Sequence, residues 1–223
     1  IIANLEHAKE QGLSEGSINK LREAFTGPLA DAFRNVFSDD PPARVTPVKV
    51  EMAPSVYSVK FPTPRRYHKE GSLAMAALMS RLERFRYVYR NSLATIASPA
   101  YPVRKEKVDP KAPLEERYRL TVDLRIVNSH TIPIKFPLPR LETFMERVAG
   151  KAFWGTLDLF GGYWQIPLHK DSRQFFSIMT DAGVWTPYRL IQGSRNAAGP
   201  FQGIVSEVLG DALNTACDQY IDD

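Results

Sequence analysis

Acidic residues follow apolar, strand-like runs at two places in the sequence. Asp158 comes near the end of residues 152–159, and Asp222 and Asp223 follow residues 219–221. Carboxylates, water and substrate phosphates are the ligands that Mg²⁺ prefers. If the two runs lie side by side, the three acids predict a two-metal site for phosphoryl transfer. In isolation, the more usual role of such acids is a cap at Asp158 and a turn at Asp222 and Asp223.

The elements that must position these acids are a mixture of hairpins and helices. Helix-like spacing of apolar residues predicts helices at 17–25, 29–37, 67–89, 141–148 and 196–209. Alternating apolar residues predict strands at 100–104, 118–124, 152–159, 175–180, 184–190 and 219–222. Hairpins beside packed helices predict the α+β class.

The composition is that of an ordinary folded protein. The 223 residues are 43% hydrophobic and 24% charged, and 17 prolines concentrate in residues 41–64 and 99–113, where extended connections are expected. The lone Cys217 excludes an internal disulfide and a cysteine zinc cluster. The longest uncharged run, residues 91–103, is too short to cross a membrane. We therefore expect a soluble, cytoplasmic protein without a membrane partner, and the missing initial methionine indicates an excerpt of a longer chain.

Positive charge concentrates in the middle of the chain. The net charge of +4 divides into −2 for residues 1–59, +8 for 60–119 and −2 for 120–223. A phosphate-bearing partner is the expected binder of such a basic segment. For Arg81, Arg84, Arg86 and Arg90, a solvated helix face is the equally weighted alternative.

Five motifs follow one another in an order and spacing typical of one polymerase family. They are RLTVDLRIVN at 119–128, FPLPR at 136–140, LDLFGGYWQIPL at 157–168, QG at 192–193 with FQ at 201–202, and YIDD at 220–223. On these motifs the chain resembles the fingers and palm of a reverse transcriptase, mostly of the gypsy-type LTR retrotransposon group, and also of retroviruses. A weaker similarity reaches back through 103–105 to 33–39. It resembles the junction between protease and polymerase.

The resemblance implies a domain plan. Residues 1–47 are expected to form a helical linker segment, and residues 48–223 the fingers and partial palm of a right-hand polymerase with an antiparallel palm sheet. The thumb, connection and RNase H parts are not expected within these residues.

The resemblance also assigns metal and nucleotide roles. Asp158, Asp222 and Asp223 match the catalytic triad that binds two Mg²⁺ or Mn²⁺ ions, with the Leu159 carbonyl as a further ligand. The residues expected to contact the incoming nucleotide are Lys105 and Arg119 at the triphosphate, Tyr163 as a steric gate against ribose, and Gln192 beside the sugar. Without the resemblance, the two cations read as solvated hairpin charges and the tyrosine as a core residue.

Template and primer contacts are expected from Arg125, Asn128 and Gly193. A Gln-Gly pair is otherwise an ordinary turn. The segment 196–202 departs from the family pattern, because Pro200 is displaced. The family pattern therefore does not predict the geometry of the helix that begins there.

The leading hypothesis is thus a fragment of an RNA-directed DNA polymerase that adds deoxynucleoside triphosphates to a primer on an RNA or DNA template. Expected partners are the template-primer and the remaining polyprotein domains, namely protease, RNase H and integrase, within a cytoplasmic virus-like particle. The alternatives are a non-catalytic nucleic-acid-binding protein derived from a retroelement, which would use the basic middle segment, and a decayed remnant.

Overall fold

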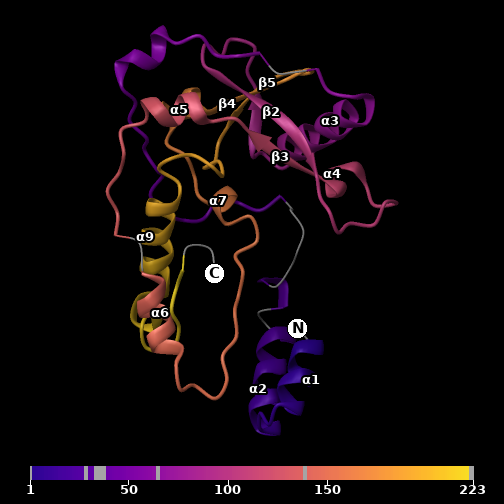
Figure 1. Ribbon diagram of the computed structural model, residues 1–223, viewed down its shortest axis with the longest axis vertical. Coiled ribbons are helices and arrows are strands. Elements are labelled where there is room, and N and C mark those ends of the chain that lie inside the picture. The colour runs from indigo at the N-terminus through magenta and orange to yellow at the C-terminus, as the bar shows by residue number, and fades with distance from the viewer. Residues whose placement is uncertain (1, 28–29, 33–38, 64–65, 138–139, 221–223) are drawn as a thin grey trace.

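A five-stranded mixed sheet organises the upper part of the molecule in Figure 1. The computed structural model describes residues 2–27, 30–32, 39–63, 66–137 and 140–220. The strand order is β1-β5-β4-β2-β3, in which β2 and β4 are parallel and the other neighbours antiparallel. The strands are β1 (Val88–Arg90), β2 (Ala97–Arg104), β3 (Tyr118–Val122), β4 (Ser177–Thr180) and β5 (Gly183–Pro187).

Helices surround the sheet and extend away from it, which confirms the predicted α+β class. The α-helices are α1 (Ile2–Glu10), α2 (Glu15–Thr26), α3 (Lys69–Arg84), α4 (Leu114–Arg117), α5 (Arg125–His130), α6 (Leu141–Val148), α7 (Gly162–Gln165), α8 (Lys170–Arg173) and α9 (Ala198–Leu209). Short 3₁₀ helices are η1 (Ala30–Ala32), η2 (Pro54–Ser58), η3 (Gln174–Phe176) and η4 (Gly210–Ala212).

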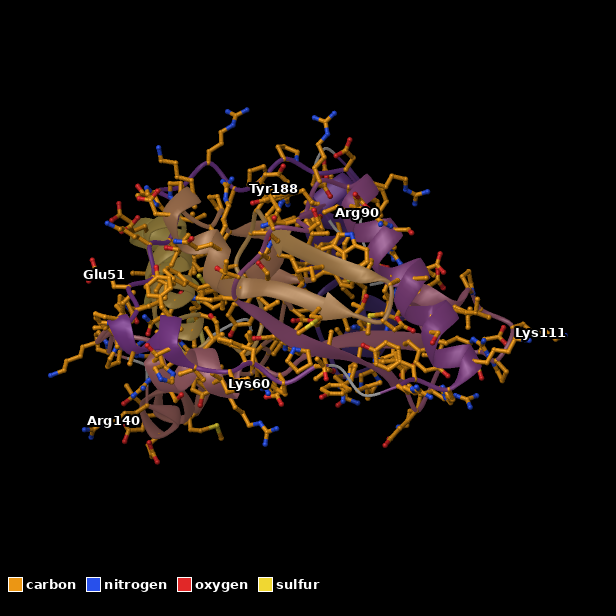
Figure 2. The ribbon with its side chains drawn as sticks, turned by 90° about the horizontal axis from the view of Figure 1, so that it is seen from above. Glu51, Lys60, Arg90, Lys111, Arg140 and Tyr188 are labelled. Atoms are coloured by element: carbon orange, nitrogen blue, oxygen red, sulfur yellow. The ribbon has the colours of Figure 1, made fainter. Side chains whose placement is uncertain are left out.

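The strands predicted at 100–104 and 118–124 pair as one antiparallel hairpin, and those predicted at 175–180 and 184–190 as another. β2 and β3 pair from Ala100↔Val122 to Arg104↔Tyr118, and the long loop between them carries α4. Figure 2 shows Lys111 at the outer tip of this loop, far from Arg140. β4 and β5 pair around a tight turn whose Gly183 has φ +144°, a backbone angle that other residues rarely adopt.

The long helix predicted at 67–89 is wrong at its C-terminal end. α3 stops at Arg84 because the Arg86 N–H bonds the Glu83 carbonyl (3.0 Å) and the Tyr87 N–H bonds the Leu82 carbonyl (2.9 Å). This pair of bonds is the Schellman ending of a helix. It turns the chain into β1, so the last residues of the predicted helix are strand. The buried face of α3 contacts Tyr118 of β3.

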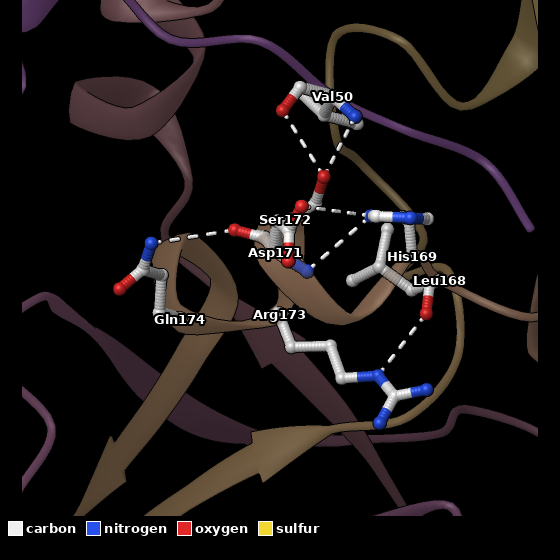
Figure 3. Close-up of polar contacts among 7 residues, drawn as sticks. All are labelled: Val50, Leu168, His169, Asp171, Ser172, Arg173 and Gln174. Atoms are coloured by element: carbon white, nitrogen blue, oxygen red, sulfur yellow. Dashed lines mark hydrogen bonds and ion pairs between the residues drawn. The ribbon is translucent and has the colours of Figure 1, made fainter.

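The core lies between the sheet, α3 and the connecting segments that pack against them. Its largest fully buried side chains are Phe176, Phe201, Met75, Met79, Leu168, Ile178, Leu190, Val56, Val88 and Val127. The proline-rich connection before α3 joins this core. Val48 forms a parallel bridge with Leu168, and the Ser172 hydroxyl bonds both N–H (2.8 Å) and C=O (3.1 Å) of Val50 (Figure 3). The expected extended connection is confirmed around Val48 and Val50, where backbone pairing and the Ser172 hydroxyl hold it, but Pro54–Ser58 form the 3₁₀ helix η2 instead.

α9 forms despite the altered motif that precedes it. Pro200 sits in the first turn, where a proline costs little because the first N–H groups of a helix have no partner within it. Gly199 and Gly203, four residues apart, leave room for the Phe136 side chain, since a Cβ on either would lie 2.9 Å from one of its carbon atoms. The helix predicted at 141–148 is confirmed as α6.

The strand predicted at 152–159 is wrong. These residues have no regular structure, all are exposed, and none of their N–H groups donates a hydrogen bond to a described residue. Alternation of side chains predicts a strand only where a neighbouring strand supplies hydrogen bonds, and no described segment does so. Of the strand predicted at 219–222, Gln219 and Tyr220 are not in strand conformation, and the rest lies outside the described residues.

The N-terminal helices form a small separate pair below the sheet in Figure 1. α1 and α2 pack on one another through the buried Leu5 and Ile18. α2 confirms the helix predicted at 17–25, with Ser14 as its N-cap. Most of the helix predicted at 29–37 lies outside the described residues. Only Ala30–Ala32 can be compared with the prediction, and they form the 3₁₀ helix η1. Within the described segments, no helix is both long and apolar enough to cross a membrane.

Candidate functional site

One face of the β2–β3 hairpin carries the two cations predicted to contact a triphosphate. Arg119 pairs with Val103, and the Lys105 N–H continues the ladder to the Arg117 carbonyl (2.8 Å). Paired residues of an antiparallel ladder share a face, so Lys105 and Arg119 are diagonal neighbours on the same face. Both side chains are exposed. The hairpin register thus brings the two cations together without any contact between them.

The same hairpin face continues into a cleft of about 390 Å³. Tyr101 and Thr121, which pair with each other, are part of its wall. All three residues predicted to contact template or primer also line it, namely Arg125, Asn128 and Gly193. The structure therefore brings this predicted group together in one cleft.

An ion pair that sequence reasoning missed fixes Arg125 at the cleft. Its guanidinium donates to both carboxylate oxygens of Asp123, from Nε at 2.8 Å and from Nη2 at 2.6 Å. These hydrogen bonds hold the pKa of the Asp123 carboxyl below its ordinary value, although partial burial opposes them. The spacing of an acid two residues before an arginine, in the quoted motif, was the available signal.

Asn128 fastens the turn that carries Gln192 and Gly193. Its side-chain amide donates to the Gly193 carbonyl (2.9 Å) and accepts from the Arg195 N–H (2.8 Å). Gly193 has φ +88°, which favours glycine. Gln192 is exposed at this turn. Asn128 therefore has a structural task at the cleft, in addition to the template contact predicted for it.

The turn is supported from behind by a residue that was not predicted. Asn196 is buried, accepts from the Ile134 N–H (3.1 Å) and donates to the Ile132 carbonyl (2.8 Å). These bonds connect the start of α9 with the segment after α5. The altered motif at 196–202 thus contains an asparagine whose two hydrogen bonds hold these segments together.

Tyr163 lies in α7, against the buried Phe201 of α9, with ring centroids 5.0 Å apart. The preceding glycines make this approach possible. Gly161 has φ +58°, and a Cβ on Gly162 would lie 2.7 Å from the Phe201 ring. Tyr163 is half-buried. Its position thus combines a core contact with an accessible side.

Asp158 stands apart from these groups. It is exposed, and its carboxylate makes no hydrogen bond or ion pair with a described residue. The Leu159 carbonyl accepts the Gly162 N–H (2.9 Å) at the start of α7. Asp222 and Asp223 lie outside the described residues, and within the described ones no three His, Cys, Asp or Glu side chains are arranged to hold a metal.

Comparison with known proteins decides the family. Residues 103–223, more than half of the chain, match the model of the family described as reverse transcriptase (RNA-dependent DNA polymerase). The chain belongs to the reverse transcriptase family. The predicted resemblance is therefore confirmed, and reverse transcriptases are nucleotidyltransferases that generally use divalent metal ions.

Relatives of this reverse transcriptase chain include polyproteins of Drosophila melanogaster transposons. The retrovirus-related Pol polyprotein from transposon 297 is 27% identical over 75% of this chain and 15% of that protein. The corresponding polyprotein from transposon gypsy is 32% identical over 61% of this chain and 13% of that protein. The chain thus spans about one seventh of the length of these relatives.

Solved structures share the fold. The prototype foamy virus protease-reverse transcriptase aligns with a TM-score of 0.75 at 18% identity, over 99% of this chain and 28% of that one. A foamy viral protease-reverse transcriptase in complex with an RNA/DNA hybrid aligns with a TM-score of 0.69 at 16% identity. At these identities the likeness concerns the fold.

Proposed function

We propose that the chain is the fingers and part of the palm of an RNA-directed DNA polymerase that acts within a retrotransposon polyprotein. The observation that carries the proposal is the continuous hairpin face on which Lys105 and Arg119 lead into the cleft with Arg125, Asn128 and Gly193. Cations on a hairpin suit a triphosphate, and the adjacent cleft suits a nucleic-acid strand. The reaction is the transfer of a deoxynucleotide to a primer 3′-hydroxyl on an RNA or DNA template.

The proposed metal ligands are Asp158, Asp222 and Asp223, with the Leu159 carbonyl. The donor set fits Mg²⁺ or Mn²⁺, because it is all oxygen and the Asp158 carboxylate is exposed and unpaired among the described residues. Two bound ions would activate the attacking hydroxyl and neutralise the leaving pyrophosphate. The chain contributes the negative charge that holds them.

The remaining residues select and orient the nucleotide and the strand. Lys105 and Arg119 bind the triphosphate, and Gln192 lies beside the sugar. Tyr163, backed by Phe201, blocks the space of a ribose 2′-hydroxyl. Because the phenyl ring itself does the blocking, Tyr163→Phe should keep the preference for deoxynucleotides and Tyr163→Ala should lose it.

The domain plan remains part of this proposal. Residues 1–47 form the linker after a protease, and residues 48–223 the fingers and partial palm, with thumb, connection, RNase H and integrase elsewhere in the polyprotein. The hydrogen bond from the Ala43 N–H to the Gln165 carbonyl (2.8 Å) indicates that contacts with the polymerase body start a few residues before 48. The proposed site of action is a cytoplasmic virus-like particle.

Primer extension with the full-length polyprotein product tests the proposal. We expect incorporation of deoxynucleotides on a primed RNA template to require Mg²⁺ or Mn²⁺, and Asp158→Asn to lower the rate on the order of a thousandfold, as loss of a metal ligand should. Asp211→Asn is the matched control, because this exposed carboxylate, in η4, also makes no hydrogen bond or ion pair with a described residue. Its rate should stay within about twofold.

Two other results would redirect the assignment. An unchanged rate in Asp158→Asn would remove this residue from the reaction. Salt-sensitive binding of RNA or DNA, with no metal-dependent incorporation by the wild-type product, would favour the non-catalytic nucleic-acid-binding alternative.

A further inference from the structure

A second cleft, of about 540 Å³, shares no lining residue with the first. It lies where the start of the proline-rich connection meets the turn after α3, α8 and the segment after β5. Its lining residues are Asp39, Asp40, Pro41, Pro42, Arg86, Pro167, Arg173, Tyr188 and Arg189. Three separate elements each supply one arginine. None of these arginines has a role in the proposed polymerase reaction.

Arg189 forms the buried part of this cleft. Only 3% of its surface is exposed, and its guanidinium lies 3.9 Å from the centre of the Tyr87 ring. It donates to the backbone carbonyls of Trp164 (3.1 Å) and Asp40. Burial lowers the pKa of this guanidinium, and Tyr87 and the nearby Asp40 and Asp39 oppose the effect. Its charge is thus held by carbonyls and a ring, with no carboxylate of the described residues within ion-pair distance.

Arg173 offers unused donors at the same cleft. Its Nε donates to the Leu168 carbonyl (3.1 Å), as Figure 3 shows, and the guanidinium lies 5.0 Å from the centre of the Tyr188 ring. Neither Nη atom makes a hydrogen bond or ion pair with a described residue. The Nε bond fixes the position of the Arg173 guanidinium, and its two Nη atoms are available to a ligand.

Arg86 also has no side-chain partner among the described residues, and its backbone is unusual. It holds φ +56° two residues after the end of α3, a position that glycine occupies without strain. An arginine there costs stability that a glycine would restore. Residues held in such conformations cluster at binding sites, where the side chain is needed.

We propose that this second cleft binds a phosphate group through Arg86, Arg173 and Arg189. Guanidinium groups bind phosphate oxygens through paired N–H donors, and partial burial strengthens such bonds. Asp39 and Asp40 line the same cleft. These carboxylates oppose anion binding, so the three guanidinium groups must outweigh them. The phosphate belongs either to a nucleic-acid backbone or to a free compound such as pyrophosphate.

Titration of the 223-residue chain with pyrophosphate tests the proposal, followed by calorimetry and by NMR of the arginine Nε–H groups. We expect the Nε–H signals of Arg173 and Arg189 to shift, and Arg86→Gly and Arg173→Gln each to weaken binding about tenfold. Arg84→Gln is the matched control. It removes one exposed arginine charge from the end of α3, but Arg84 does not line the cleft, so binding should change less than about twofold.

A loss of binding in Arg86→Gly would not come from unfolding, because this substitution should raise the melting temperature by about 1–4 °C while it weakens binding. Asp39→Asn should tighten binding a few-fold.

The same variants, tested with a single-stranded oligonucleotide, identify the source of the phosphate. Weaker binding of the oligonucleotide alone indicates a nucleic-acid backbone, and weaker binding of pyrophosphate indicates a free phosphate compound. The proposal is overturned if neither probe binds, if Arg86→Gly and Arg173→Gln leave binding unchanged, or if Arg84→Gln weakens it equally. Asp158→Asn should not alter pyrophosphate binding at this cleft, which separates the proposal from the polymerase assignment.

Discussion

The β2–β3 hairpin and the segment 152–159 carry the two kinds of charge that the proposed reaction needs, and they are built in opposite ways. The hairpin cations sit on a ladder of backbone hydrogen bonds that is backed by α3 and the core. Asp158 lies in an exposed segment whose N–H groups and carboxylate have no described partner. The cationic side of the site is therefore shaped by the described residues themselves, whereas nothing among them fixes the position of the acid.

The largest expected effect contrasts a buried ring of the core with an exposed ring of residues 152–159. Phe201→Ala removes a buried ring that supports Tyr163 and Gly162, and it should lower the free energy of unfolding by about 3–5 kcal/mol. Phe153→Ala, in the exposed segment, should change it by less than about 0.5 kcal/mol. Urea unfolding of the two variants measures the difference. Similar losses in both would show that residues 152–159 are packed after all.

The next effect concerns the clamp at the cleft. Asn128→Ala deletes the bonds to the Gly193 carbonyl and the Arg195 N–H, and it should cost about 2 kcal/mol in the same unfolding assay. Asn128→Asp keeps an acceptor for Arg195 and loses only the donor to Gly193, so we expect a smaller loss. If the alanine variant is as stable as the wild type, the clamp does not hold the turn.

The smallest effect is the pH dependence of the Asp123–Arg125 pair. Because the folded-state pKa of Asp123 is lowered, the pair stabilises the fold above the ordinary pKa of an aspartate, near 4. This contribution is lost as the pH falls through the lowered value. The stability difference between wild type and Asp123→Asn should be present at pH 6 and shrink below pH 4, as thermal melts at both values would record. Arg125 is largely exposed, so salt should weaken the difference.

The sequence predicted those elements whose own residues carry the decisive signal. The two hairpins have alternating strands and turn residues, and the amphipathic pattern of α6 predicted its bounds. The end of α3 was missed because the residue in the left-handed position is Arg86, where glycine is the usual signal. Residues 152–159 alternate like a strand, but pairing depends on a neighbour that the pattern cannot reveal.

The candidate site likewise combines features that local motifs predicted with features that depend on contacts between distant segments. Motif order located the cleft residues, and the hairpin register then placed Lys105 and Arg119 on one face. The Asp123–Arg125 pair is local, and its spacing in the motif could have revealed it. The bond from Asn196 to the Ile132 carbonyl joins segments 64 residues apart, so local patterns did not predict it. The first and last of the three arginines of the second cleft are more than 100 residues apart in the sequence, and only the fold brings them together.

Amide hydrogen exchange along the 223-residue chain tests most directly whether the two regions differ as described. Amides of β3 that take part in the ladder should exchange at least about a thousandfold more slowly than unstructured peptide, because opening them requires disruption of the sheet. Amides of residues 152–159 should exchange within about tenfold of the unstructured rate. Protection of the segment around Asp158 equal to that of β3 would contradict the contrast, since it would mean that the acid is held as firmly as the cations.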